Sequence, residues 1–216
     1  ILCEPLQGES GVRPLEKEYL GRIRRLCDDN ALLLIFDEVQ TGIGRTGTLF
    51  AYEQLGVVPD ILTSAKALAN GLPIGAMLTT DKIAASFTVG SHASTFGGNP
   101  VAAAAAVATM RVMLAEGFFA EVRRKGEYLA ENLSGLADKH PKFAQGQRGL
   151  GLIQGLILTQ AGIEQGQAIV QKLFERGLLI NFAGNAVLRF IPPLVVSRDE
   201  IDILINALDQ VLSELV

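Results

Sequence analysis

The sequence predicts an α/β fold built on a parallel sheet. The first observation is a continuous apolar run at 32–36 that stops at the acidic pair Asp37 and Glu38. A short run of this kind is typical of a strand that is buried on both faces of a sheet. The second observation is the order of the elements, because a strand-like start and an amphipathic helix at 16–29 precede this run. The buried face of this helix is expected to consist of Tyr19, Ile23, Leu26 and Cys27. Strand, helix and strand in succession predict a parallel crossover unit.

The composition fits a globular chain with a sizeable core. Apolar residues make up 49% of the 216 residues and charged residues 19%, which is enough for one large domain or one and a half ordinary ones. A net charge of −4, without basic runs interleaved with aromatics, argues against a nucleic-acid partner. The apolar stretch at 101–108 is mostly alanine and too short to span a bilayer, and no signal peptide is apparent.

Two further features concern the setting of the chain. Cys3 and Cys27 have no metal-ligand spacing, so we expect free thiols in a reducing cytoplasm and no metal site. The chain opens in a strand-like run without an initiator methionine. We therefore expect that residues precede it and that they carry part of the active site.

The first half of the chain continues with alternating short elements. Pro5 should end the first strand, because proline has no N–H for the ladder. The glycine-rich stretch at 41–47 is expected to be a flexible connector, since it lacks the Gly-x-Gly-x-x-Gly pattern. Asn99 and Pro100 predict the cap and first residue of an alanine-rich, closely packed helix that extends to 116. The other expected elements are a helix at 49–55, a strand at 59–64, a turn and a strand within 71–79, and a helical turn at 81–85.

The second half predicts a small α+β unit. Gly117 is a natural break before a helix at about 118–139, and a Ser-Arg-Asp-Glu capping box at 197–200 begins the last helix. Further expected elements are strands at 150–158, 178–182 and 187–191 and a helix at 164–176. We therefore predict two domains, 1–116 and 117–216. Gly149 and Gly151 lack the third glycine of a dinucleotide loop and predict a strand with close backbone contacts.

Asp37 is the first candidate for chemistry. The carboxyl edge of a parallel sheet is where open α/β folds bind ligands, and an apolar setting makes a charged carboxylate costly without a cation or donor. One interpretation is a Walker-B-like acid that holds magnesium beside a nucleotide. A nucleotide-binding ATPase with such an acid would also need a P-loop, which is missing from these 216 residues. This interpretation also leaves Lys66 without a role. The other is an acid paired with the pyridinium nitrogen of pyridoxal 5'-phosphate (PLP), with Lys66 as the nearby amine.

Four motifs in order resemble the class III (ω-amino acid) aminotransferases. They are Glu-Pro-Leu-Gln-Gly-Glu at 4–9, Phe-Asp-Glu-Val-Gln-Thr-Gly at 36–42, Thr-Ser-Ala-Lys at 63–66 and Ser-Thr-Phe-Gly-Gly-Asn-Pro at 94–100. The resemblance covers essentially the whole chain and implies the C-terminal half of an enzyme about twice as long. It implies the aspartate aminotransferase-like fold (fold type I), with part of the large PLP domain at 1–116 and the C-terminal small domain at 117–216.

The resemblance assigns the cofactor residues. Lys66 resembles the lysine that forms the Schiff base with PLP and then moves a proton on the substrate. Asp37 resembles the acid that keeps the pyridinium nitrogen protonated, so that the ring acts as an electron sink. Gln40 matches the residue that hydrogen-bonds the phenolic oxygen of the ring. Val39 matches the residue that packs under the ring, although an ordinary core role is nearly as plausible for it.

The resemblance also assigns subunit and substrate contacts. Thr95, with Ser94, matches residues that bind the cofactor phosphate of the neighbouring subunit, which implies a homodimer with shared sites. Arg189 resembles the arginine that grips a substrate carboxylate in a bidentate fork. Glu9 resembles the glutamate that pairs with this arginine when an amino donor reacts through its far amine. His92 and His140 are expected to be structural or exposed.

The expected reaction moves the ω-amino group of N2-acetylornithine to 2-oxoglutarate in arginine biosynthesis. Succinylornithine, ornithine or 4-aminobutyrate as donor, or an aminomutase, remain open, because the residues that recognise the acyl group are expected outside this stretch. A nucleotide-binding ATPase fragment is a remote alternative. A third hypothesis is an inactive fragment or a non-catalytic homologue. The motif residues, among them Lys66 and Arg189, are all present, which argues against a homologue that has lost its catalytic residues.

Overall fold

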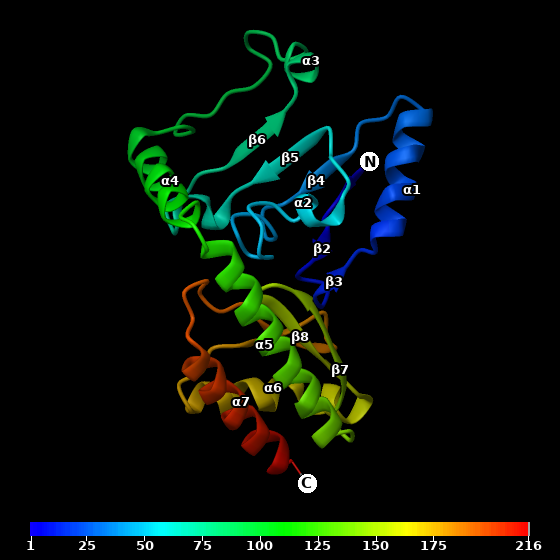
Figure 1. Ribbon diagram of the computed structural model, residues 1–216, viewed down its shortest axis with the longest axis vertical. Helices are drawn as coiled ribbons and strands as arrows, with labels where there is room; N and C mark the ends of the chain where they lie inside the picture. The colour runs from blue at the N-terminus through cyan, green and yellow to red at the C-terminus, as the bar shows by residue number, and fades with distance from the viewer. Residues whose placement is uncertain (216) are drawn as a thin grey trace. The chain divides into compact units, whose positions relative to one another are not determined.

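The computed structural model describes residues 1–215, which divide into two compact units (Figure 1). The first unit contains Ile1–Pro5 and Leu15–Phe119, and the second contains Leu6–Pro14 and the chain from Ala120 onward. The chain therefore leaves the first unit after Pro5 and returns at Leu15, where the Leu15 N–H donates to the Pro5 carbonyl at 3.0 Å. This differs from the contiguous division expected at 116/117, because the 6–14 segment packs into the core of the second unit.

The first unit contains a four-stranded mixed sheet. Its strand order is β1 (Leu2–Cys3), β4 (Ile35–Asp37), β5 (Ile61–Ser64) and β6 (Ala76–Thr79). β1, β4 and β5 are parallel, and β6 is antiparallel to β5. Helix α1 (Lys17–Asp29) connects β1 to β4 (Figure 1), so the predicted parallel crossover is confirmed. The unit also contains α2 (Tyr52–Leu55), the 3-10 helix η1 (Lys66–Ala69), α3 (Asp81–Ala84) and α4 (Pro100–Met113).

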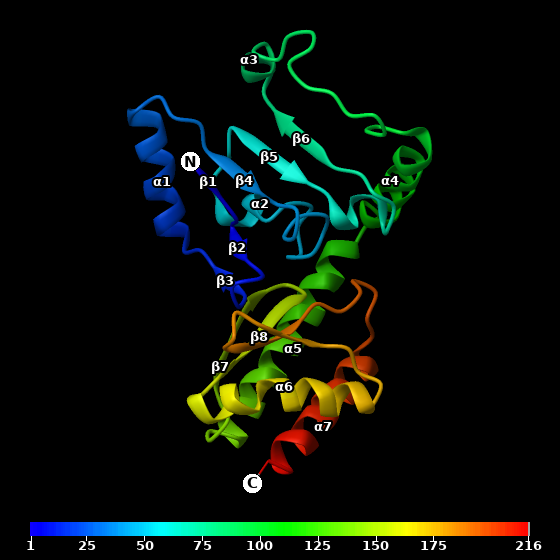
Figure 2. The ribbon, with the colours of Figure 1, turned by 180° about the vertical axis from the view of Figure 1, so that it is seen from behind.

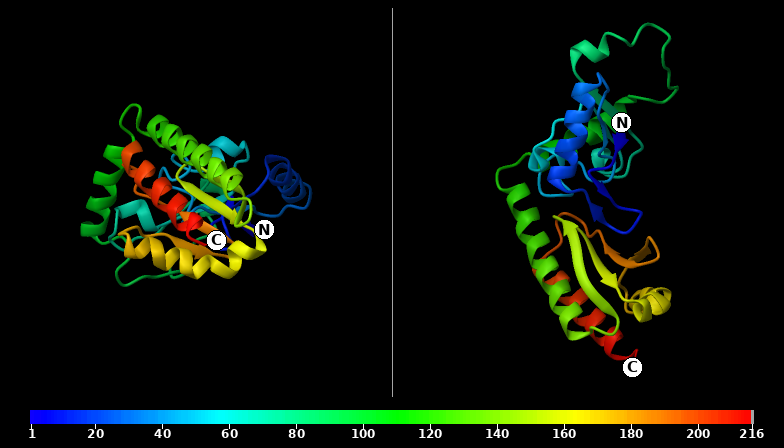
Figure 3. Two further views of the ribbon diagram at one scale, coloured as in Figure 1. Left: turned by 90° about the horizontal axis from the view of Figure 1, so that it is seen from below. Right: turned by 90° about the vertical axis from the view of Figure 1, so that its right-hand side faces the viewer.

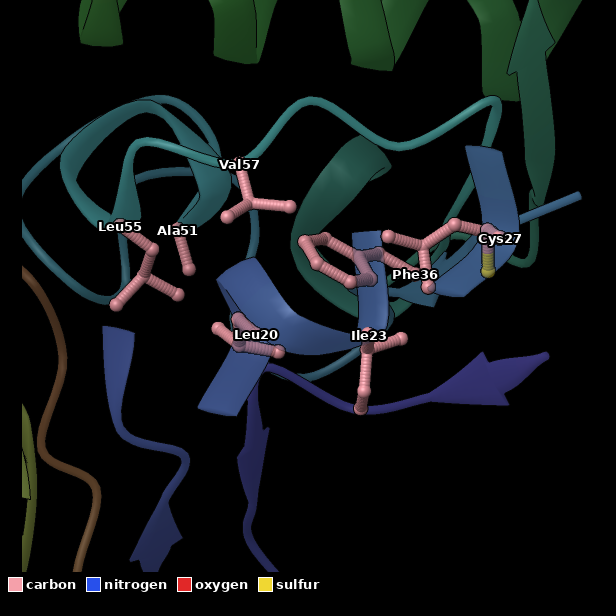
Figure 4. Close-up of a cluster of buried hydrophobic side chains, with 8 residues drawn as sticks. Leu20, Ile23, Cys27, Phe36, Ala51, Leu55 and Val57 are labelled. Atoms are coloured by element: carbon pink, nitrogen blue, oxygen red, sulfur yellow. The ribbon is translucent and has the colours of Figure 1, made fainter. Parts of the chain in front are cut away.

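The core of the first unit lies between α1, β4 and the α2 segment. The buried side chains that form it are Leu20, Ile23, Cys27, Leu34, Phe36, Ala51, Leu55 and Val57. Figure 4 labels all of them except Leu34. Phe36 is fully buried, and burial of such a side chain contributes about 1.5–3 kcal/mol to the folded state. This core holds the strand that ends at Asp37 in place.

Two predictions about this core were wrong in detail. Leu32 and Leu33 are 45% and 43% exposed and precede β4, which begins only at Ile35. The reason is the end of α1, where the Leu32 N–H donates to the Cys27 carbonyl at 2.9 Å and ties this segment to the helix. Tyr19 and Leu26, expected on the buried face of α1, are also exposed.

The second unit is an antiparallel sheet with helices beside it (Figure 2). The strand order is β7 (Ala144–Leu150), β8 (Ile153–Leu158), β10 (Val187–Phe190) and β9 (Asn181–Ala183). The helices are α5 (Phe118–Lys139), α6 (Gln160–Glu175) and α7 (Arg198–Ser213), of which α6 contacts three of the strands and α7. The capping box predicted at Ser197 is present, with reciprocal bonds to Glu200.

The expected strand at 150–158 spans the turn of a hairpin, because β7 ends at Leu150 and β8 begins only at Ile153. The two strands lie side by side in Figure 3. The chain reverses at Gly151, whose φ of 56° lies in the left-handed region that favours glycine. Gly149 meets the expectation of close contacts, because a Cβ there would lie 2.3 Å from the carbonyl oxygen of Ile153.

A short ribbon, β2 (Leu6–Gln7) paired with β3 (Arg13–Pro14), belongs to the second unit. The side chains of Leu6 and Val12 are buried against Ile153 and Val187. The loop between the two strands carries Glu9.

Among the described residues, no single helix is long and apolar enough to cross a membrane. The helices α4 and α5 meet the length and composition criteria only when they are taken together across the break between them.

Candidate active site

Asp37 is the last residue of β4, at the carboxyl edge of the sheet in the first unit. The side chain is half-buried, and its Oδ1 accepts a hydrogen bond from the Val39 N–H at 2.9 Å. Oδ2 accepts no hydrogen bond from any group in residues 1–215. One carboxylate oxygen therefore fixes the side chain to its own turn, and the other is available to a ligand.

Lys66 follows the carboxyl end of β5, the parallel neighbour of β4. Asp37 is the register partner of Thr63, so Asp37 and Lys66 extend from the same edge of two adjacent strands. The φ of Lys66 is 46°, a left-handed value that costs a non-glycine residue on the order of 1–3 kcal/mol. The first turn of the chain beyond β5 is η1, which contacts α4. Tertiary packing therefore holds an exposed lysine at a strained turn beside the sheet edge.

Val39 and Gln40 follow Asp37 in a tight turn and are both half-buried. The turn is closed by the Gly42 N–H, which donates to the Glu38 carbonyl at 2.9 Å. A Cβ at residue 42 would lie 2.7 Å from that carbonyl oxygen and 2.9 Å from the Phe50 ring. Only glycine fits there, so the stretch at 41–47, expected to be a flexible connector, begins as a packed turn that is almost entirely buried.

Glu38 has a structural role that the sequence reading did not assign. Its buried carboxylate accepts hydrogen bonds from the N–H groups of Ala51 and Tyr52, at 2.7 and 2.8 Å, and from the Thr41 hydroxyl at 2.9 Å. These bonds tie the turn after β4 to the start of α2. Burial raises the pKa of Glu38 above its usual value, although the three donors act in the opposite direction.

Glu38→Gln should lower the free energy of unfolding by about 2 kcal/mol. The new NH₂ group replaces an acceptor and faces backbone or hydroxyl donors, so at least one buried hydrogen bond is lost. Because burial raises the folded-state pKa, the wild type should also lose some stability as the pH rises from the usual glutamate value through that raised pKa. The variant should lack this component. Urea unfolding at several pH values measures both effects, with the exposed Asp29→Asn as control, and equal unfolding midpoints for wild type and Glu38→Gln would contradict the assignment.

Ser94 and Thr95 lie in the exposed loop before α4. The Ser94 Oγ accepts from the Gly97 N–H at 3.0 Å, and Asn99 caps α4 by accepting from the Ala102 N–H at 2.9 Å, as predicted. Within residues 1–215, no hydrogen bond joins Ser94 or Thr95 to Asp37 or Lys66. The loop therefore presents both hydroxyl side chains at the surface of the first unit.

The second unit brings Glu9 and Arg189 together. Arg189 lies in β10, an inner strand of the sheet, and only 7% of its side chain is exposed, whereas 74% of the Glu9 side chain is exposed. The Arg189 Nη1 donates to the Glu9 Oε1 at 2.7 Å. A buried guanidinium without such partners would be strongly destabilising, so this pair stabilises the charge inside the sheet.

Asn181 is a neighbour of Arg189 that the sequence analysis missed. It is the register partner of Arg189 on β9, and its Oδ1 accepts from the Arg189 Nε at 3.0 Å. This bond orients the guanidinium plane. The Ala-Gly-Asn stretch at 183–185 could have revealed Asn181, because it is typical of a hairpin turn, and such a turn sets which residues face each other across two strands.

The fold is that of a class of PLP-dependent transferases, as comparison with solved structures shows. An N-acetylornithine aminotransferase from Stenotrophomonas maltophilia has a TM-score of 0.88 at 39% identity, covering 99% of this chain and 56% of that chain. An ornithine aminotransferase from Plasmodium yoelii has a TM-score of 0.92 at 31% identity, covering 100% of this chain and 57% of that chain. The predicted fold class is therefore confirmed.

The family model for class-III aminotransferases matches residues 1–212, and the chain belongs to this family. An acetylornithine aminotransferase from Methanocaldococcus jannaschii is 48% identical over 215 residues, covering 100% of this chain and 53% of the relative. A succinylornithine transaminase from Yersinia pseudotuberculosis is 46% identical over 201 residues, covering 93% of this chain and 48% of the relative. The chain spans about half the length of the curated relatives it matches. Enzymes of this family depend on PLP.

Proposed function

We propose that this chain forms part of an enzyme that transfers the ω-amino group of N2-acetylornithine to 2-oxoglutarate. The products are N-acetylglutamate 5-semialdehyde and glutamate, which places the reaction in arginine biosynthesis. The observation that carries the proposal is the buried Arg189 with Glu9 on its Nη1 at 2.7 Å. The names of the curated relatives support acetylornithine as the donor.

The residues of the first unit fit PLP. The free Oδ2 of Asp37 would accept a hydrogen bond from the ring nitrogen, and the Lys66 amine would hold the aldehyde. Gln40 would bind the phenolic oxygen, Val39 would pack under the ring, and Ser94 with Thr95 would bind phosphate. When bound, PLP supplies an electron sink for the carbon that carries the amino group. Lys66 would then move a proton at that carbon, because its amine is the base among these residues.

Arg189 and Glu9 would solve a recognition problem. Acetylornithine reacts through an amine far from its carboxylate, whereas 2-oxoglutarate reacts at a carbon adjacent to one. Glu9 over Arg189 neutralises the guanidinium, and Glu9 moved aside exposes a bidentate carboxylate site. One arginine can thereby serve both half-reactions.

Arg189→Lys should raise the KM of both carboxylate substrates about tenfold or more, because lysine keeps the charge but loses the planar fork. Glu9→Ala should leave Arg189 exposed and shift the ratio of donor kcat/KM values towards glutamate and away from acetylornithine. Both changes are measured by steady-state assays of an enzyme that is as long as the curated relatives. Glu127→Ala, at an exposed glutamate of α5 in the same unit as Glu9, is the control. An unchanged donor ratio in Glu9→Ala would show that Glu9 does not control access to Arg189.

Other ω-amino donors remain candidates within the family. Succinylornithine is favoured by the named Yersinia relative, and ornithine by the named Plasmodium structure. A panel of acetylornithine, succinylornithine, ornithine and 4-aminobutyrate, compared by kcat/KM, identifies the donor. A preference for any donor other than acetylornithine would overturn the substrate assignment but not the transaminase.

We further propose a cytoplasmic homodimer with shared sites, consistent with the free thiols Cys3 and Cys27 and with the exposed position of Thr95. Mixing Lys66→Ala chains with Thr95→Asp chains tests it. In a mixed dimer one site collects both defects and the other collects neither, so each heterodimer should have one active site of its two. Random exchange of equal amounts makes about half of the dimers mixed, so two inactive homodimers should yield about a quarter of the normal site count. Verified heterodimers that stay inactive would show that both residues serve the same-chain site.

A further inference from the structure

The loop that carries Glu9 has a constrained backbone. It connects β2 to β3, and the Val12 N–H donates to the Gly8 carbonyl at 3.3 Å. Gly11 and Val12 both have left-handed φ values, 102° and 54°, and the Val12 side chain is fully buried. A non-glycine residue such as Val12 keeps this conformation only where its surroundings impose it.

Arg148 on β7 holds one side of this loop. Its Nε and Nη2 both donate to the Gly11 carbonyl oxygen, at 3.0 and 2.7 Å. Two bonds from a charged guanidinium to one oxygen are stronger than a neutral hydrogen bond and fix direction as well as distance. Gly11 is two residues from Glu9, so this contact sets where the Glu9 backbone lies.

The other side of the loop packs against the turn between β9 and β10. A Cβ at Gly184 would lie 2.6 Å from the backbone carbon and oxygen of Ser10. The same hairpin carries Asn181 and Arg189, whose side chains are hydrogen-bonded to each other. The loop backbone is therefore clamped between Arg148 and the hairpin that presents Arg189.

We propose that Arg148 is a positioning residue for the Glu9–Arg189 pair: by fixing the Gly11 carbonyl it keeps the loop in place, so that a competing carboxylate reaches Arg189 through rotation of the Glu9 side chain alone. The exposed Glu9 side chain is the moving part, and the buried Arg189 is the fixed part. Only one part of this inference rests on the proposed function, namely that the competing carboxylate belongs to a substrate.

The first test needs no ligand and uses the 216-residue chain labelled with ¹⁵N-arginine. NMR measures how fast the Nη groups of Arg189 rotate, which the bond to Glu9 slows. Arg148→Lys keeps the charge but cannot donate two hydrogen bonds in the same planar geometry to the Gly11 carbonyl. The rotation of the Arg189 Nη groups should therefore become roughly 3- to 10-fold faster. In a Glu9→Gln background the same substitution should have no further effect, because Arg148 acts through Glu9. Arg176→Lys is the control, since Arg176 also donates to a backbone carbonyl in this unit.

The second test adds glutarate as a carboxylate probe. In the wild type, glutarate should shift the Nε signal of Arg189 and leave that of Arg148 unchanged, and Arg148→Lys should bind glutarate several-fold more tightly. Signals of Arg148 and Arg189 that move together would overturn the proposal, because the loop would then open as a unit. An equal effect of Arg148→Lys with and without the Glu9 carboxylate would overturn it as well.

The outcomes separate the two proposals. If glutarate leaves Arg189 unmoved while the ligand-free test succeeds, the carboxylate role in the proposed function fails and the positioning role stands. If Arg148→Lys does not fold, hydrogen exchange in the wild type decides. The Arg148 Nε–H should then exchange more slowly than the Arg189 Nη hydrogens, and equal rates would overturn the clamp.

Discussion

Lys66→Ala should lower turnover by at least about 10⁴-fold, the largest effect expected of any single change, because in the proposed function Lys66 supplies both the covalent attachment of PLP and the base that moves the proton. The protein should still bind the cofactor through Asp37 and the other ring and phosphate contacts. In a wild-type enzyme that is as long as the curated relatives, borohydride reduction should attach the pyridoxyl group covalently to a single peptide. That peptide should be the one that contains Lys66. Mass spectrometry of a digest locates the label.

Lys82→Ala is the matched control, because Lys82 is an exposed lysine of the same unit on α3. It should leave the rate and the labelled peptide unchanged. A label on a lysine other than Lys66, or an active Lys66→Ala enzyme, would refute the assignment.

Asp37→Asn should lower kcat on the order of 10³-fold, since in the proposed function the charge of Asp37 keeps the pyridinium nitrogen protonated and a neutral amide would not. The structure predicts that stability changes little. Asparagine can still accept the Val39 N–H through its side-chain oxygen, and this is the bond that fixes the side chain. Activity and unfolding should therefore separate.

Absorbance of the bound cofactor, kcat and the urea midpoint are measured together for Asp37→Asn. Asp81→Asn, an exposed acid of α3, is the control. A near-normal kcat would show that Asp37 is only structural, and a large drop in the urea midpoint would show that the loss of activity reflects unfolding.

The parallel crossover was predictable because it depends on local patterns. The apolar run before Asp37, the periodicity of α1 and the short connection between them each follow from burial and hydrogen bonding within a few residues. The caps at Asn99 and Ser197 were predictable for the same reason. Element boundaries were less accurate, since Leu32 belongs to the turn that ends α1 and the hairpin turn at Gly151 divides a continuous apolar pattern.

The buried polar contacts depend on pairs that lie far apart in the sequence. Nothing near Glu38 indicates that Ala51 and Tyr52 will complete its hydrogen bonds, and nothing near Arg148 indicates Gly11. The 6–14 segment was assigned to the wrong unit because its two strands are short and its core partners, Ile153 and Val187, are more than a hundred residues away.

By itself, the sequence determined the α/β class, the family motifs and the residue types from which a PLP site is proposed, because each depends on short stretches of chain. Only the tertiary structure decided that Arg189 is buried, that Asn181 orients it, and that Arg148 clamps the loop on which Glu9 reaches it. The physical reason is that sheet register and burial set these side-chain distances, and both depend on contacts between residues far apart in the sequence.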